Sequence, residues 1–172
     1  MMMNALRNSV VMAALLLVIR VYLGWNWLTS GWGKVTSEFD ASGFIQGAIA
    51  NPVTNQAGDA AFPWYVAFLE AVALPLGNIF SFMVAYGEVF VGLGLIFGIL
   101  TVYASFFGLS MNFAFLFAGT VSTNPLMLLL GFFVLAAGHN AGRFGGDYYL
   151  QPYVQQKMKP KRKQKRTANA AA

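Results

Sequence analysis

The chain has 172 residues, of which 58% are hydrophobic and 10% are charged. Because a soluble domain carries about 25% charged residues, this composition excludes an ordinary soluble enzyme and indicates one small integral membrane domain. The absence of cysteine excludes disulfides, thiol nucleophiles and thiolate-bound iron–sulfur clusters in the chain. The net charge of +5 comes mainly from a basic C-terminal tail, which beside a membrane favours contact with anionic lipid over nucleic acid.

The first expected element is a membrane-spanning helix at residues 10–33, after a short N-terminal segment at 1–9. A signal peptide would also contain such an apolar stretch, but no A-x-A cleavage site follows it and the apolar character resumes after Arg20. Tryptophan side chains favour the membrane–water interface, and the far end of this segment carries Trp25, Trp27 and Trp32.

The second region, residues 35–78, is the most polar part before the tail and is expected to form a long outer loop. Asp40 or Ser42 is predicted to cap a short helix, and Pro63 suits the first turn of another. Both helices are too short to cross a bilayer core of about 30 Å, so they are predicted to lie along the outer interface.

The apolar sequence that starts at Ile79 continues for about twice the length of one span, so a tight turn is predicted within Gly98–Val102. The predicted fold is all-α: a four-helix integral membrane bundle at residues 10–153, with short interfacial helices in its outer loop. The three further spans are expected at residues 79–100, 102–119 and 125–141.

Four spans place both ends of the bundle on one side of the membrane. The basic tail at residues 154–172 follows the fourth span, whereas the acidic outer loop follows the first. Because positively charged segments are retained in the cytoplasm, both termini are predicted to be cytoplasmic in a multi-pass protein of the plasma membrane.

Three of the expected spans each carry one polar residue near the middle, at Arg20, Glu88 and Asn112. A charged side chain at that depth is costly unless it is paired, is protonated or faces water. A rise of about 1.5 Å per residue along antiparallel helices brings Arg20 and Glu88 to similar depths, so the sequence predicts an ion pair between them with Asn112 beside it. Such a centre either fixes helix register as a structural pair or binds the carbonyl or hydroxyl group of a ligand.

Aromatic residues lie one or two helical turns from this centre, and Tyr22, Tyr86 and Trp25 are predicted to wall an apolar pocket. Lys34, at the outer end of the first span, is a candidate for recruiting an anionic substrate. His139 is the one histidine, and a metal or haem usually needs more ligands than that, so no metal site is predicted.

Six short motifs, taken in their order and spacing, give the chain a resemblance to a known family. They are R-x-x-L-G from Arg20, S-G-W-G-K (Ser30–Lys34), G-E-x-x-x-G-L-x-L-x-x-G (Gly87–Gly98), M-N-x-x-F-x-x-A-G (Met111–Gly119), S-T-N-P (Ser122–Pro125) and A-G-R-x-G-x-D-x-x-L (Ala141–Leu150). With these motifs the chain resembles the DoxX/DoxD-like family of bacterial four-helix membrane proteins, over roughly Ala14–Pro152.

The resemblance implies a bacterial cell membrane and a redox role. DoxD-like members resemble the small membrane subunit of a thiosulfate:quinone oxidoreductase, and other members belong to thiol- or oxidative-stress complexes. The expected function is therefore a membrane subunit of a quinone-linked redox system, with Arg20, Glu88 and Asn112 near a quinone and no covalently bound cofactor. Expected partners are the lipid bilayer and a redox subunit, and a homo-oligomer is an open option. The alternatives are a non-catalytic scaffold that docks a redox or stress enzyme, and a small-molecule or proton pathway.

Overall fold

The computed structural model describes residues 2–150, and within that range it is built from helices without a β-strand. An isolated bridge joins Thr54 and Ala60 in a loop. This architecture confirms the predicted all-α fold. In chain order the elements are α1 (Met2–Asn8), α2 (Val10–Thr36), α3 (Ala41–Ala50), α4 (Pro63–Phe68), the π-helix η1 (Leu69–Ala73), α5 (Gly77–Phe97), α6 (Thr101–Phe117), α7 (Asn124–Ala137) and the 3-10 helix η2 (Gly138–Gly142).

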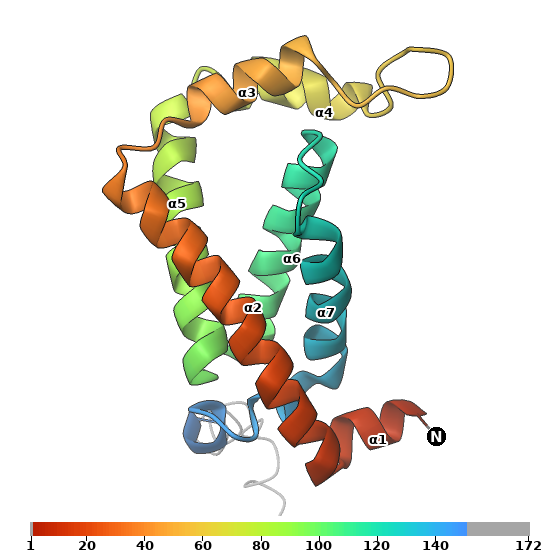
Figure 1. Cartoon of the computed structure of the whole chain (residues 1–172), viewed down its shortest axis with the longest axis vertical. Coiled ribbons are helices and arrows are strands. Elements are labelled where there is room, and N and C mark those ends of the chain that lie inside the picture. Colours follow the sequence, from red (N-terminus) through yellow and green to blue (C-terminus); the bar gives the residue numbers. More distant parts are fainter. Residues whose placement is uncertain (1, 151–172) are drawn as a thin grey trace, which may run out of the picture.

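Helices α2, α5, α6 and α7 form the bundle, and each packs against two of the others (Figure 1). α2, α5 and the segment Asn124–Gly142, which contains α7, are long and apolar enough to cross a membrane. α6 is a shorter apolar helix of 17 residues, a length at the lower limit for crossing a bilayer. The bounds of α5 and α6 leave a turn at residues 98–100, inside the predicted range.

Glycines set how closely α2 and α5 approach each other. A Cβ atom built at Gly24 would lie 2.8 Å from the carbonyl oxygen of Gly92, and one built at Gly31 would lie 2.7 Å from the backbone nitrogen of Val89. No side chain fits at either position, and small residues are a common means of bringing membrane helices into contact. These contacts fix the register of the two helices, with Gly24 opposite Gly92 and Gly31 opposite Val89.

We call α3, α4 and η1 the cap layer, because they lie across one end of the bundle in Figure 1. Asp40 is the N-cap of α3, and its carboxylate accepts a hydrogen bond of 2.9 Å from the backbone nitrogen of Ser42. Hydrogen bonding from Ser42 lowers the pKa of Asp40 below its ordinary value. α4 begins at Pro63, as predicted, whereas the sequence gives no signal for the π-helix that follows it.

The opposite end of the bundle is closed by α1, η2 and the short segment after η2. Asn140 donates hydrogen bonds of 2.9 and 3.0 Å to carbonyl oxygens in and just after α1. Asp147 accepts hydrogen bonds from the backbone nitrogens of Leu100 (2.7 Å), the N-cap of α6, and Thr101 (2.9 Å), its first residue. The backbone nitrogen of Asp147 itself donates to the carbonyl oxygen of Gly98 at 2.7 Å. The segments on either side of the α5–α6 turn are therefore joined to the end of the described chain. The predicted tail at residues 154–172 lies outside the described residues.

Candidate functional site

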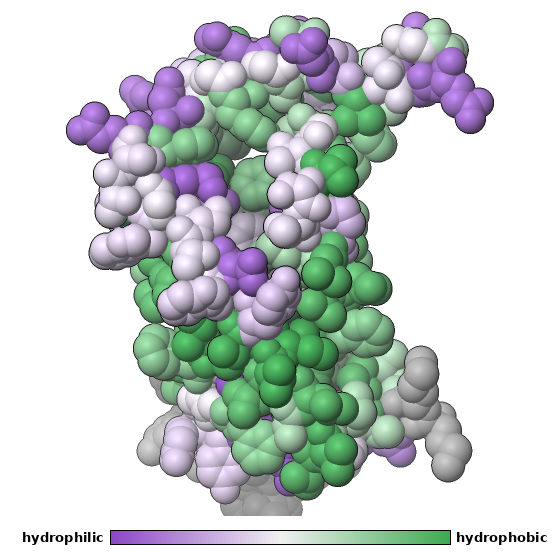
Figure 2. All heavy atoms as spheres, in the orientation of Figure 1, coloured by the Kyte–Doolittle hydropathy of each residue, from purple (hydrophilic) through white to green (hydrophobic). Residues whose placement is uncertain are grey.

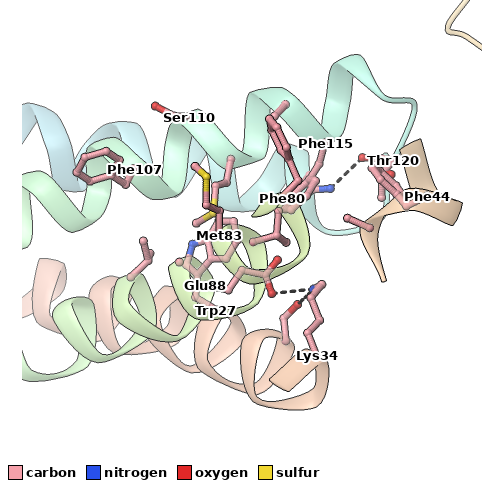
Figure 3. Close-up of a pocket in the computed structure, with 18 of the residues that line it drawn as sticks. Trp27, Lys34, Phe44, Phe80, Met83, Glu88, Phe107, Ser110, Phe115 and Thr120 are labelled. Atoms are coloured by element: carbon pink, nitrogen blue, oxygen red, sulfur yellow. Dashed lines mark hydrogen bonds and ion pairs between the residues drawn. The ribbon is translucent and has the colours of Figure 1, made fainter. Parts of the chain in front are cut away.

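A cavity of about 1060 Å³ lies inside the bundle beneath the cap layer. Its walls come from α2, α5, α6, the start of α7 and the cap layer. Much of the wall is aromatic, and Figure 3 shows Trp27, Phe44, Phe80 and Phe115 around one space. The volume is at the upper end of the range for small-molecule sites, about 300–1,000 Å³.

An ion pair between Lys34 and Glu88 stands in this wall, with 2.7 Å between Lys34 Nζ and Glu88 Oε2 (Figure 3). The Glu88 side chain is 1% exposed, whereas the Lys34 side chain is 23% exposed. Lys34 Nζ also donates to Ser30 Oγ at 2.8 Å and lies 5.6 Å from the centre of the Phe39 ring. A buried carboxylate is thus neutralised by a cation that keeps contact with the surface, which is the arrangement that burial of a charge requires.

The predicted ion pair between Arg20 and Glu88 is wrong. The glycine contacts between α2 and α5 place Gly31, and with it Lys34 one turn further on, at the level of Glu88. Arg20 lies at the level of Gly98, where a built Cβ would overlap its guanidinium. Gly98 is ten residues, or about 15 Å, along α5 from Glu88. The sequence estimate aligned the midpoints of hydropathy-defined spans, but α2 extends beyond its predicted end and the glycines shift the register by about two turns.

Arg20 instead joins α2 to the C-terminal part of the described chain. It is 1% exposed, and its guanidinium donates hydrogen bonds to the carbonyl oxygens of Ala141 at 3.1 Å and Phe144 at 3.2 Å. The Asp147 carboxylate lies near enough to attract it electrostatically. Arg20 therefore stabilises the end of the bundle opposite to the cavity and is not part of the cavity wall.

Asn112 is buried at nearly the predicted depth, but it faces a different space. A Cβ built at Gly87 would lie 3.5 Å from Met111 Sδ, which places Asn112 within about one turn of the Glu88 level. Asn112 and Ser105 line a second cavity of about 10 Å³, and Asn112 Oδ1 has no hydrogen-bond partner among the described residues. The three predicted polar residues therefore do not form one centre.

The three aromatic residues expected around the site face outward. Tyr22, Trp25 and Tyr86 are 43%, 62% and 39% exposed and lie outside the cavity wall. Trp27 and Phe115 line the wall instead, with ring centroids 6.4 Å apart. Proximity along a helix gives depth but not the face of the helix. Trp27 is three residues after Gly24 and four residues before Gly31, and this helical spacing is the sequence signal that places it on the inner face of α2.

Sequence reasoning also missed the contributions of the cap layer and of the α6–α7 loop. Asn124 Nδ2 donates to the carbonyl oxygen of Thr120 at 2.9 Å, and both residues line the cavity (Figure 3). The S-T-N-P motif includes Asn124 and pointed to this loop. Phe44 of α3 had no such signal, because its place in the wall depends on how the cap layer folds over the bundle.

The described residues include no group of three or more His, Cys, Asp or Glu side chains that could hold a metal ion. His139 lies in η2, at the end of the bundle opposite to the cap layer. Lys34 and Glu88 are the charged groups of the cavity wall: one is a hydrogen-bond-donating cation, and the other is a carboxylate that can accept hydrogen bonds.

A comparison with protein-family models matches the DoxX family over residues 15–120, which is more than half of the chain. The matched range contains α5, α6 and nearly all of α2, and with them Lys34 and Glu88. Neither the curated proteins nor the solved structures gave a match. The apolar helices and the family match identify a multi-pass membrane protein, and the chain belongs to the DoxX family.

Proposed function

We propose that this chain is a membrane subunit of a quinone-linked redox system and that it binds a quinone ring in the cavity beneath the cap layer. The observation that carries the proposal is the Lys34–Glu88 ion pair, set in an otherwise largely apolar and aromatic wall. Ligand sites of this kind combine apolar surface with a few polar groups that fix orientation. Membership of the DoxX family, often linked to redox or stress, supports the same role.

Lys34 is the group that would hold a carbonyl oxygen of the ring. An ammonium group has three N–H donors, and Glu88 and Ser30 accept from Lys34 in the structure. The remaining donor can make a charge-assisted hydrogen bond to a ligand oxygen. Phe44 and Phe115, arranged edge to face with centroids 6.3 Å apart, offer apolar surface to the ring.

Glu88 is the group that would exchange a proton with the ligand. Reduction of a quinone to a quinol adds two electrons and two protons to its two carbonyl oxygens. The electrons would come from a partner redox subunit that oxidises thiosulfate or a thiol. Glu88 stands as a carboxylate in the ion pair, so it would first take up a proton from water at the polar mouth of the cavity and then pass it to the ligand oxygen that Lys34 holds, while the second proton would come from water.

The test is quinone extraction from purified protein, together with quenching of tryptophan fluorescence by a tailless benzoquinone. Trp27 lines the cavity, so a Trp27→Phe variant identifies its part of the signal. We expect wild-type protein to carry extractable quinone and to show saturable quenching of Trp27, and Lys34→Met to lose both.

Glu70→Gln is the matched control, because Glu70 is an exposed carboxylate of η1 outside the cavity wall. It should behave as the wild type. Absence of quinone and of saturable quenching in the wild type would refute the proposal and leave the scaffold role as the better explanation.

A further inference from the structure

We infer that the ligand carries an apolar chain and that this chain leaves the cavity between α5 and α6, toward the lipid. The inference rests on the proposed function, because it describes the rest of the molecule whose ring lies at Lys34 and Glu88. It is carried by the cavity wall itself, whose exposed residues include two groups of different chemistry.

The first side is polar. Side chains that line the cavity and are also exposed mark the places where it opens. On α2 and the α6–α7 loop these are Thr29, Ser30, Ser122 and Thr123. Figure 2 shows a hollow between the cap-layer end of α2 and the α6–α7 loop, with polar residues at its edges and hydrophobic residues within. Lys34 and Glu88 lie near this mouth, since Ser30 is bonded to Lys34.

The second side is mainly apolar. On α5 and α6 the exposed wall residues include Met83, Phe90 and Phe107, which are 57%, 68% and 58% exposed, and Ser110 is a polar residue among them. Both helices are apolar and belong to the membrane bundle, so this side of the cavity faces the lipid. A cavity with one polar and one lipid-facing mouth orients a ligand with a polar head and an apolar chain.

The size of the cavity agrees with such a ligand. A volume of about 1060 Å³ is at the limit for a complete drug-sized molecule, and a single ring with its substituents fills only a small part of it. The remaining wall, from Val91 and Met111 to Phe107, is apolar except for Ser110, whose hydroxyl already donates to the carbonyl oxygen of Phe106 at 2.9 Å. An alkyl or isoprenoid chain fills apolar space without leaving a polar atom unpaired.

Gly87 keeps the passage between α5 and α6 open. It lines the cavity, and a Cβ built there would meet one neighbour, Met111 Sδ at 3.5 Å, an ordinary contact with a flexible side chain. A Cβ atom at this position therefore meets no backbone atom, and the longer side chain of a leucine would narrow the passage. Gly33 is a matched control at the same end of the bundle, because a Cβ built there meets nothing within 4 Å.

The experiment uses a benzoquinone with a ten-carbon chain that ends in a diazirine, photolysed on the full-length protein in phosphatidylcholine nanodiscs. Adducts are mapped by mass spectrometry with and without excess tailless benzoquinone. Only adducts that the tailless ring suppresses are specific, and Leu129, an exposed residue of α7 outside the cavity wall, serves as the background site.

We expect suppressible adducts at Met83, Phe90 or Phe107. Gly87→Leu should lower their yield about tenfold, the change that about 1.4 kcal/mol produces, while Gly33→Leu leaves it unchanged. Quenching of Trp27 by the tailless ring should survive in Gly87→Leu. Suppressible adducts at Thr29 or Ser122 instead would overturn the inference.

Two other outcomes separate the possible failures. Adducts on α5 and α6 that the tailless ring does not suppress would show that the chain of the probe reaches these residues from the bilayer while its ring is not bound in the cavity, and would also overturn the inference while leaving the proposed function intact. Absence of both extractable quinone and Trp27 quenching by the tailless ring would refute the proposed function itself. If Gly87→Leu does not fold, the adduct map of the wild-type protein still shows whether the chain of the probe lies between α5 and α6.

Discussion

Lys34 and Glu88 lie 54 residues apart in sequence, yet their charged atoms are 2.7 Å apart across α2 and α5. Gly31 makes this possible, because its missing side chain lets the two helices touch at Glu88. The pair combines a carboxylate that is almost fully buried with an ammonium group that reaches the surface. This asymmetry decides how each partner responds to removal of the other.

Replacement of Lys34 should destabilise the protein more than replacement of Glu88. Lys34→Met leaves the buried Glu88 without its cation, whereas Glu88→Gln leaves a lysine that water can reach. Denaturation of both single variants and of the double variant in one detergent should give a coupling energy of about 0.5–3 kcal/mol. Strictly additive losses would show that the ion pair does not form.

Arg20 and Glu88 should behave independently. Arg20→Leu removes two hydrogen bonds from a charged donor, worth about 1.5–3 kcal/mol each at most, at the end of the bundle opposite to Glu88. The losses in Arg20→Leu/Glu88→Leu should therefore add to within about 0.3–0.5 kcal/mol in the same denaturation assay. A larger coupling energy would show that Arg20 and Glu88 interact, contrary to the structure.

Two glycines of α2 should respond in opposite directions to alanine. At Gly31 a Cβ would lie 2.8 Å from Glu88 Cβ, so Gly31→Ala should cost about 1–3 kcal/mol of stability through overpacking. Gly33→Ala meets open space and should stabilise the helix by about 0.5–1 kcal/mol. Melting temperatures of both variants check this, and a neutral Gly31→Ala would contradict the close contact.

The small cavity at Ser105 and Asn112 gives a test of buried polarity. Ser105 Oγ and Asn112 Oδ1 are buried without a hydrogen-bond partner among the described residues. A cavity of about 10 Å³ is at the threshold for holding one water molecule. Ser105→Ala should therefore leave the melting temperature unchanged or raise it. A loss of more than about 1 kcal/mol would show that the hydroxyl has a partner, such as that water.

The predicted topology can be tested because the chain contains no cysteine. Single cysteines at Asn4 in α1 and at Asn55 in the cap-layer loop lie at opposite ends of the bundle. A membrane-impermeant maleimide should label Asn55→Cys on intact cells, and Asn4→Cys only after permeabilisation. The reverse labelling pattern would show that the protein has the opposite orientation in the membrane.

Hydropathy and local signals were sufficient for the fold. The apolar runs predicted the bundle helices, the length of the apolar run from Ile79 predicted the turn before Thr101, and Asp40 and Pro63 mark the starts of α3 and α4. These features depend on a few neighbouring residues, which a sequence shows directly. The π-helix and the packing of the cap layer depend on contacts with distant helices, so no local pattern revealed them.

The site was predicted in part. Glu88 stood out because a lone carboxylate in an apolar helix needs a partner, and Lys34 stood out at the outer end of its helix. The pairing of Lys34 with Glu88 was not predicted, because hydropathy gives the depth of a residue in the membrane only to within a few helical turns. Register comes from glycine contacts across α2 and α5, and these become visible only when both helices are placed.

The partners of Arg20 have a consequence for how the protein is made. Arg20 belongs to α2, whereas its acceptors at Ala141 and Phe144 follow more than a hundred residues later in the chain. During insertion its guanidinium must remain hydrated or near lipid headgroups until α7 is in place. The final environment of Arg20 is therefore completed only after the segment that follows α7 has been translated.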